Sequence, residues 1–438
     1  MLKRFKEYFS IIWQKGRNSS SELFWFTGGQ IVILVLSFFT VKIISRIGTG
    51  EYGIYSLIIT LSFLLSAVYY GPIQQGFTRF FYIYAEKNQT PLFTKMMIRF
   101  IFFSTIGLLA VVLPLALGIQ SFFNKNYLLL ILFTGTFIAF SKSSEFFNAS
   151  FNILRKRKEN SVLQSLEKLA IIIVLLSLLF YKSLALLNIL IGLSFVALIF
   201  SMLKYFFFKK SMHDTAASSK SVKKEIFTAL ITYSTPFLVW GLSGWLQLNS
   251  EKWIIAKMLS TSDVGIYSVM ISLVAILIGI PNTLLNEFSL PIIFQQFTNL
   301  NEHEKTENGL NYIFILSWLV AALTVVSTIV TFFFGKYLIL LISYKEYLIY
   351  YQLLPLLTFG TGLFLTAQTM INLGLALNSP KVYLIPKVSI GIISVVLSLI
   401  LINYFGVKGA AYAVLTVGII FFISISLINK KLVAALRK

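Results

Sequence analysis

The chain has 438 residues, of which 57% are hydrophobic and only 12% are charged. A water-soluble protein of this length cannot bury so much apolar surface, whereas a lipid bilayer solvates it, so the composition excludes a soluble globular fold. Cysteine is absent, which also excludes disulfide bonds and thiol chemistry.

The first predicted element is a basic amphipathic stretch, residues 1–20, on the cytoplasmic membrane surface. Its start resembles the charged region of a signal peptide, because basic residues closely follow the initiating methionine. Trp13 and the segment 14–17 interrupt the stretch before an apolar run of sufficient length begins. We therefore expect these residues to be retained rather than cleaved.

Twelve apolar stretches follow, six in each half of the chain. A membrane-spanning helix needs about 20 predominantly apolar residues. The predicted spans are 24–44, 54–77, 97–118, 127–147, 162–181, 184–208, 227–249, 265–285, 310–334, 348–376, 382–403 and 408–428. The predicted fold class is therefore an all-α polytopic membrane protein with twelve transmembrane helices.

A repeated motif relates the two halves. The segment 53–56, Gly-Ile-Tyr-Ser, recurs unchanged as 265–268, and Gly29 falls on Gly241 at the same offset. Since each half has an even number of spans, both have the same orientation, and a pseudo-two-fold axis along the membrane normal should relate them. The expected parts are a six-helix lobe at 1–208, a basic cytoplasmic linker at 209–226 and a second six-helix lobe at 227–438.

Lysine and arginine residues orient the predicted spans. With a cytoplasmic N-terminus, cytoplasmic segments collect most of the 37 basic residues, including the run 155–158, the central linker and the tail 430–438. The positive-inside rule then places both termini in the cytoplasm. Because the net charge of +21 gathers at this membrane face, it does not indicate a nucleic-acid partner.

The residues around both copies of the motif resemble a known family. The segment 46–55, Arg-Ile-Gly-Thr-Gly-Glu-Tyr-Gly-Ile-Tyr, followed by Gly71 and Arg79, is similar to the opening of the polysaccharide-biosynthesis (Wzx-type) flippases. These belong to the multidrug/oligosaccharidyl-lipid/polysaccharide exporter superfamily. The pair 251–252, Glu-Lys, ahead of 263–267, Asp-Val-Gly-Ile-Tyr, resembles the same family again. The departures from the family pattern, Ile for Leu at position 47 and Glu for Asp at position 251, leave the charge unchanged.

The resemblance implies a MATE-like fold with a V-shaped, cationic central cavity. It implies a flippase that moves undecaprenyl-diphosphate-linked oligosaccharide repeat units from the cytoplasmic to the outer leaflet of the bacterial inner membrane. Alternating access of the two lobes would drive this step in O-antigen or capsule assembly. The implied partners are the lipid-linked oligosaccharide, membrane lipids and the polysaccharide polymerase machinery, and the protein would act as a monomer.

Three alternatives belong to the same superfamily: a lipid II flippase, a teichoic-acid flippase and a MATE-type drug exporter. The first span, 24–44, contains no carboxylate, which argues against the drug exporters that commonly place an aspartate there. A membrane glycan polymerase is the alternative from another class, and the short predicted outer loops argue against it. The two histidines, at 213 and 303, lie in predicted loops, so we expect no catalytic site, no metal and no cofactor.

Charged residues in or beside the predicted spans are the candidate substrate-binding residues. A basic residue at the centre of a span costs about 2.5–3.5 kcal/mol and so indicates a counter-charge or a water-filled path. Lys142 could line a cavity, or it could form a structural pair with Glu145 one helical turn later. Arginine and lysine suit a diphosphate because their donors match phosphate oxygens. The full set is Arg46, Arg79, Arg99, Lys142, Glu145, Lys168, Glu251, Lys252 and Lys387.

Several of these candidates have a second interpretation. Arg79 and Arg99 lie near cytoplasmic span ends, where contact with lipid phosphates would explain either one alone. Lys168 follows Glu167 directly, so the two side chains point in different directions and cannot simply neutralise each other. Lys387 could line the cavity or reach the membrane interface. For the pair 251–252 the alternative is an exposed local ion pair.

Overall fold

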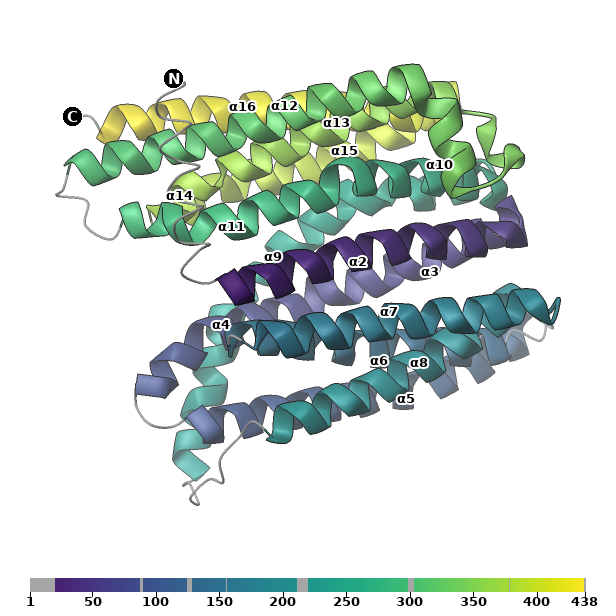
Figure 1. Ribbon diagram of the computed structural model, residues 1–438, viewed down its shortest axis with the longest axis horizontal. Helices are drawn as coiled ribbons and strands as arrows, with labels where there is room; N and C mark the ends of the chain where they lie inside the picture. Colours follow the sequence, from purple (N-terminus) through teal and green to yellow (C-terminus); the bar gives the residue numbers. More distant parts are fainter. Residues whose placement is uncertain are drawn as a thin grey trace. The chain divides into compact units, whose positions relative to one another are not determined.

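The computed structural model describes residues 20–86, 90–123, 128–154, 156–210, 220–297, 303–377 and 379–436, and these ranges contain helices and short turns without strands (Figure 1). Residues 1–19 of the expected surface stretch 1–20 and residues 211–219 of the expected linker 209–226 lie outside the described residues. The α-helices are α2 (Ser20–Ile44), α3 (Thr49–Leu65), α4 (Gly71–Glu86), α5 (Thr90–Phe123), α6 (Leu128–Ile153), α7 (Arg157–Phe180), α8 (Leu186–Lys210), α9 (Lys220–Met258), α10 (Thr261–Val274), α11 (Ile280–Gln296), α12 (His303–Ile342), α13 (Leu354–Met370), α14 (Asn372–Ala376), α15 (Leu384–Phe405) and α16 (Val407–Leu436).

Within the described ranges, twelve helical stretches are long and apolar enough to cross a membrane. The predicted fold class, all-α with twelve membrane spans, is therefore confirmed. Several helices continue beyond their apolar cores: α9 begins at Lys220, so the last part of the segment expected to be a linker is helical. Helices extend past the bilayer easily, because a polar helix satisfies its own backbone hydrogen bonds in water as well as in lipid.

The second span of each half is interrupted by a π-helical turn. Ser66–Tyr70 separates α3 from α4, and Ala275–Gly279 separates α10 from α11. In both, the first residue after the turn donates its N–H to a carbonyl five residues earlier, and a proline follows at once, Pro72 and Pro281. Proline lacks an N–H and its ring presses on the preceding turn, which the wider π turn accommodates. The internal repeat is therefore present in the structure as well as in the sequence.

The described chain forms two compact units. The unit called the N unit below contains the described residues of Gly28–Ile47 and Leu57–Leu242, and the C unit contains those of Gly48–Ser56 and Ser243–Lys438 together with residues 20–27. The division therefore passes through α9. The lobe boundaries expected from the sequence, 1–208 and 227–438, stay a prediction.

Aromatic rings form a buried cluster between α4, α5 and α6 in the N unit. Phe77 and Phe93 stack with ring centroids 5.4 Å apart, and Tyr84 and Phe146 pack against them. Helix α6 packs along both α5 and α8 (Figure 1). The side chains of α6 are thus held from two sides, which fixes the charged residues that this helix carries.

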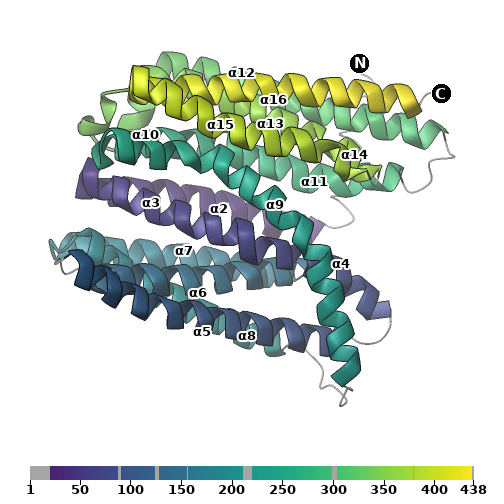
Figure 2. The ribbon, with the colours of Figure 1, turned by 180° about the vertical axis from the view of Figure 1, so that it is seen from behind.

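Small residues bring helices together in the C unit. Helix α13 packs on α12 and α16, and α15 packs on α16 (Figure 2). A Cβ atom at Gly418 of α16 would overlap the carbonyl oxygen of Gly360 on α13. Close backbone approach of this kind is a main source of helix association in lipid, because apolar side chains gain little free energy by moving from lipid tails to a helix interface.

The two copies of the repeated motif lie against each other inside the C unit. A Cβ at Gly53 would overlap the carbonyl oxygen of Thr261, and a Cβ at Gly265 would overlap that of Thr49. The contact is reciprocal, as a local two-fold axis between the copies would produce. The glycines of the motif are therefore required for the close crossing of α3 and α10.

Candidate functional site: charges at membrane depth

Among its described residues, the N unit holds two ion pairs within membrane-spanning helices. On α6, Lys142 Nζ lies 2.6 Å from Glu145 Oε2. Between α8 and α7, Lys204 Nζ lies 2.6 Å from Glu167 Oε2. Ser144 of α6 joins the second pair, because its hydroxyl donates to Glu167 and accepts from Lys204. Three helices therefore converge on one group of charged and hydroxyl side chains.

The pair on α6 is open on one side. Lys142 is 4% exposed, whereas Glu145 is 54% exposed. Glu145 also accepts a hydrogen bond from Ser66, the first residue of the π turn, and Lys142 Nζ lies 5.3 Å from the ring centroid of Phe63. The lysine is thus held under an aromatic ring while its counter-ion reaches the surface of the unit.

The pair between α7 and α8 is closed. Lys204 is fully buried, and Glu167 is only 16% exposed. The neighbouring bond between Ser201 and Ser143 adds a second polar link between α8 and α6.

The structure brings Lys142 and Glu145 together, as their spacing predicts. Glu167 bonds to Lys204, while its chain neighbour Lys168 is half-buried on another face of α7. Sequence reasoning misses Lys204 because it lies close to the two basic residues that end α8 and so looks like part of the interfacial group. The sequence feature that could have identified Lys204 is its position more than one helical turn before the end of α8.

The three candidate arginines lie apart from these pairs. Arg79 on α4 is exposed, and its guanidinium carbon lies 5.3 Å from the ring centroid of Tyr233 on α9. Arg46 is exposed in the 3₁₀ turn that follows α2, and Arg99 is exposed on α5. None of these three arginines takes part in either ion pair of the N unit.

In the C unit, Glu251 and Lys252 reach the two copies of the repeated motif. Glu251 is buried and accepts a hydrogen bond from the hydroxyl of Tyr267, at 3.2 Å. Lys252 Nζ donates to Ser56 Oγ, also at 3.2 Å. This arrangement differs from an exposed local ion pair, because each member of the acidic–basic pair bonds to a different copy of the motif.

Lys387 on α15 is buried against aromatic rings. Its Nζ lies 4.8 Å from the ring centroid of Phe364 and 5.4 Å from that of Phe421. Those two rings stack on each other with centroids 5.1 Å apart. Ring faces carry partial negative charge and stabilise an ammonium group in a desolvated position. Gly244 of α9 leaves space beside the same amine.

The parts of the chain that the structure describes hold no group of three His, Cys, Asp or Glu residues arranged to bind a metal ion. The charges at membrane depth are instead lysines with carboxylate, hydroxyl or aromatic neighbours. A helical fold with twelve candidate membrane spans that carries such buried charges defines the class of protein: a multi-pass membrane protein.

Comparison with known protein families identifies the family of this chain. The family described as "Polysaccharide biosynthesis protein" matches residues 20–297, so the chain belongs to this family. No curated protein sequence matches the chain significantly.

Solved transporters share the fold. An inward-facing multidrug resistance MATE family transporter of the MOP superfamily is 13% identical, with a TM-score of 0.64 over 93% of this chain and 99% of that one. An outward-facing MATE family transporter is 13% identical, with a TM-score of 0.65 over 94% of each chain. The lipid II flippase MurJ, in an inward closed conformation, is 13% identical, with a TM-score of 0.65 over 93% of this chain and 87% of that one. At this identity the likeness shows the MOP-superfamily fold alone.

Proposed function

We propose that the protein is a flippase for undecaprenyl-diphosphate-linked oligosaccharide repeat units. It moves them from the cytoplasmic to the outer leaflet of the bacterial inner membrane, where they enter O-antigen or capsule assembly. Membership of the polysaccharide biosynthesis family and the transporter fold support this assignment. In the proposal both termini are cytoplasmic, the protein acts as a monomer without a cofactor, and the cargo passes to polysaccharide polymerase machinery.

The observation that carries the proposal is the open ion pair of α6. A lysine at the centre of a span costs about 2.5–3.5 kcal/mol, and Lys142 is compensated by a carboxylate that is itself 54% exposed. A diphosphate brings two or more negative charges and stronger acceptor oxygens than one carboxylate. It can therefore displace Glu145 from Lys142 when the cargo passes. Lys387 in the C unit is a further buried lysine, held against two aromatic rings instead of a carboxylate.

Transport of purified substrate tests the proposal. Proteoliposomes receive a fluorescent undecaprenyl-diphosphate oligosaccharide in one leaflet, and an impermeant quencher reports its arrival in the other. We expect the protein to move this lipid between the leaflets. We expect no movement of a control lipid in which the same oligosaccharide is attached to a neutral alkyl chain. Movement of lipid II or of a teichoic-acid precursor in its place would assign one of the related flippase activities. Movement of cationic drugs alone would reject the proposal. This outcome is the least favoured, because the first span, Thr27–Ile47, contains no carboxylate.

Alternating access has its own test. The chain contains no cysteine, so a single cysteine in place of Ser66, beside the open pair, reports on water access without any background. We expect an impermeant maleimide added from one side to label this cysteine at different rates with and without substrate. Equal labelling from both sides, unchanged by substrate, would contradict alternating access.

A further inference from the structure

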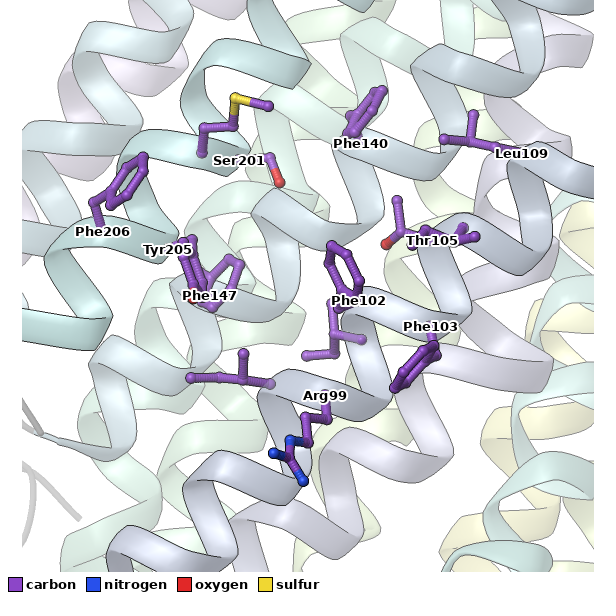
Figure 3. A pocket seen from close by; sticks show the side chains of 14 residues that line it. Arg99, Phe102, Phe103, Thr105, Leu109, Phe140, Phe147, Ser201, Tyr205 and Phe206 are labelled. Carbon is purple, nitrogen blue, oxygen red and sulfur yellow. The ribbon is translucent and has the colours of Figure 1, made fainter. Parts of the chain in front are cut away.

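A groove runs along the N unit between α5 and α8, with α6 as its floor (Figure 3). Its volume is about 820 Å³. The groove exists because α5 and α8 each pack along α6 but make few contacts with each other. Large rings such as Phe102, Phe103 and Phe206 stand along its walls and are strongly exposed.

The groove lining is mostly apolar, with the hydroxyl groups of Thr105, Ser201 and Tyr205 among its apolar side chains. Of the fourteen residues that line it, Arg99 alone carries a charge. Figure 3 places Arg99 at the lower end of the view, with its guanidinium directed away from the rings, while Leu109 lies at the upper side. A ligand for this groove therefore has a long apolar part and an anionic end.

Basic residues extend this polar end on both walls. Lys95 precedes Arg99 by one helical turn on α5, and Lys209 follows Tyr205 by one turn on α8; both lysines are exposed. Near this end Ile98 on one wall and Tyr205 on the other both pack against the same buried apolar cluster. An anionic group next to Arg99 would thus lie within a set of positive charges.

The length of the groove defines the ligand further. Ten residues separate Arg99 from Leu109, which at 1.5 Å per residue spans about 15 Å. This is half of the roughly 30 Å hydrocarbon core, and hence the depth of one leaflet. A polyprenyl chain of eleven isoprene units is much longer than one leaflet is deep, whereas a phospholipid acyl chain matches it. We propose that the groove binds an anionic glycerophospholipid, with its phosphate at Arg99 and one acyl chain between α5 and α8.

Competition between two phospholipids tests this site independently of transport. Delipidated full-length protein receives equal amounts of phosphatidylglycerol and phosphatidylcholine with identical acyl chains, and native mass spectrometry counts the lipids retained. We expect preferential retention of phosphatidylglycerol. Arg99→Ala should lower its affinity about tenfold, because a charge-assisted hydrogen bond contributes on that scale. Arg99→Lys should keep most of the preference, and Ile106→Trp, which fills the groove, should reduce retention of both lipids.

Lys336→Ala, which removes an exposed basic residue from α12, is the matched control and should leave retention unchanged. Size-exclusion profiles and thermal unfolding of each variant establish that the fold is intact. Equal retention of the two lipids by the wild type, or an unchanged preference in Arg99→Ala, would overturn the proposal. Displacement of phosphatidylglycerol by an equimolar polyprenyl diphosphate would also overturn it and identify the groove as a site for the carrier chain instead.

Discussion

The two ion pairs of the N unit differ in exposure rather than in length. Both have N–O distances of 2.6 Å, yet the carboxylate of the α6 pair is 54% exposed and that of the α7–α8 pair is 16% exposed. The closed pair links two helices, whereas the open pair lies within one turn of one helix. This difference teaches that a charge at membrane depth is not by itself a sign of function. The closed pair links α7 and α8, whereas in the proposed function the open pair exchanges its carboxylate partner for the substrate.

Breaking the closed pair should give the largest effect. Lys204→Ala leaves the Glu167 carboxylate without its main partner, and loss of one member of a buried pair costs about 3–5 kcal/mol. We expect low membrane abundance and a lowered thermal unfolding temperature in detergent. Normal abundance of this variant would show that the closed pair does not hold the fold.

Replacing both members of the closed pair should restore much of the stability. In Lys204→Met with Glu167→Leu, no charge is left uncompensated, and such apolar replacements are often neutral or stabilising. Abundance and unfolding temperature should return toward the wild-type values. If the double variant is as unstable as Lys204→Ala, loss of packing rather than an orphaned charge explains the single variant.

Breaking the open pair should affect transport more than stability. Lys142→Ala removes the proposed diphosphate partner, while the Glu145 carboxylate that it leaves is 54% exposed rather than buried. We expect flipping to slow about tenfold or more, as for loss of a charge-assisted hydrogen bond, at near-normal abundance. Lys142→Glu should be slower still, because repulsion adds to the lost attraction. A proportional fall of abundance and transport in Lys142→Ala would place this pair in the same structural class as the closed one.

The smallest effect should come from Ser66→Ala. The hydroxyl of Ser66 donates to Glu145 over 3.3 Å at an exposed position, so its loss should cost about 1 kcal/mol or less. Transport and unfolding temperature should both stay close to the wild-type values. A large loss of transport would mean that the π turn, rather than Lys142, controls the open pair.

The sequence predicts the spans and the local pair well, because both depend on short-range patterns. Hydropathy locates twelve apolar stretches, and the i, i+3 spacing brings Lys142 to Glu145 on one helix face. The closed pair joins residues 37 positions apart on two helices, and no local pattern places Lys204 beside Glu167.

The contact between the motif copies is predicted only in part. The repeat itself is visible in the sequence, but the reciprocal crossing of Gly53 and Gly265 follows from how α3 and α10 approach each other. Likewise Pro72 and Pro281 are visible, whereas the π turns before them depend on how each helix relieves the missing hydrogen bond. Tertiary packing, not propensity, decides both features.

Exchange of the two charges in the open pair tests the central claim most directly. Lys142→Glu combined with Glu145→Lys keeps an ion pair on α6 but moves the positive charge from the buried to the exposed position. Flipping of the lipid-linked oligosaccharide is measured in proteoliposomes at equal protein density. If Lys142 binds the diphosphate, the exchanged protein should be abundant and stable but still defective in transport. Recovery of wild-type flipping by the exchange would contradict a direct role of Lys142 and show that the pair is structural.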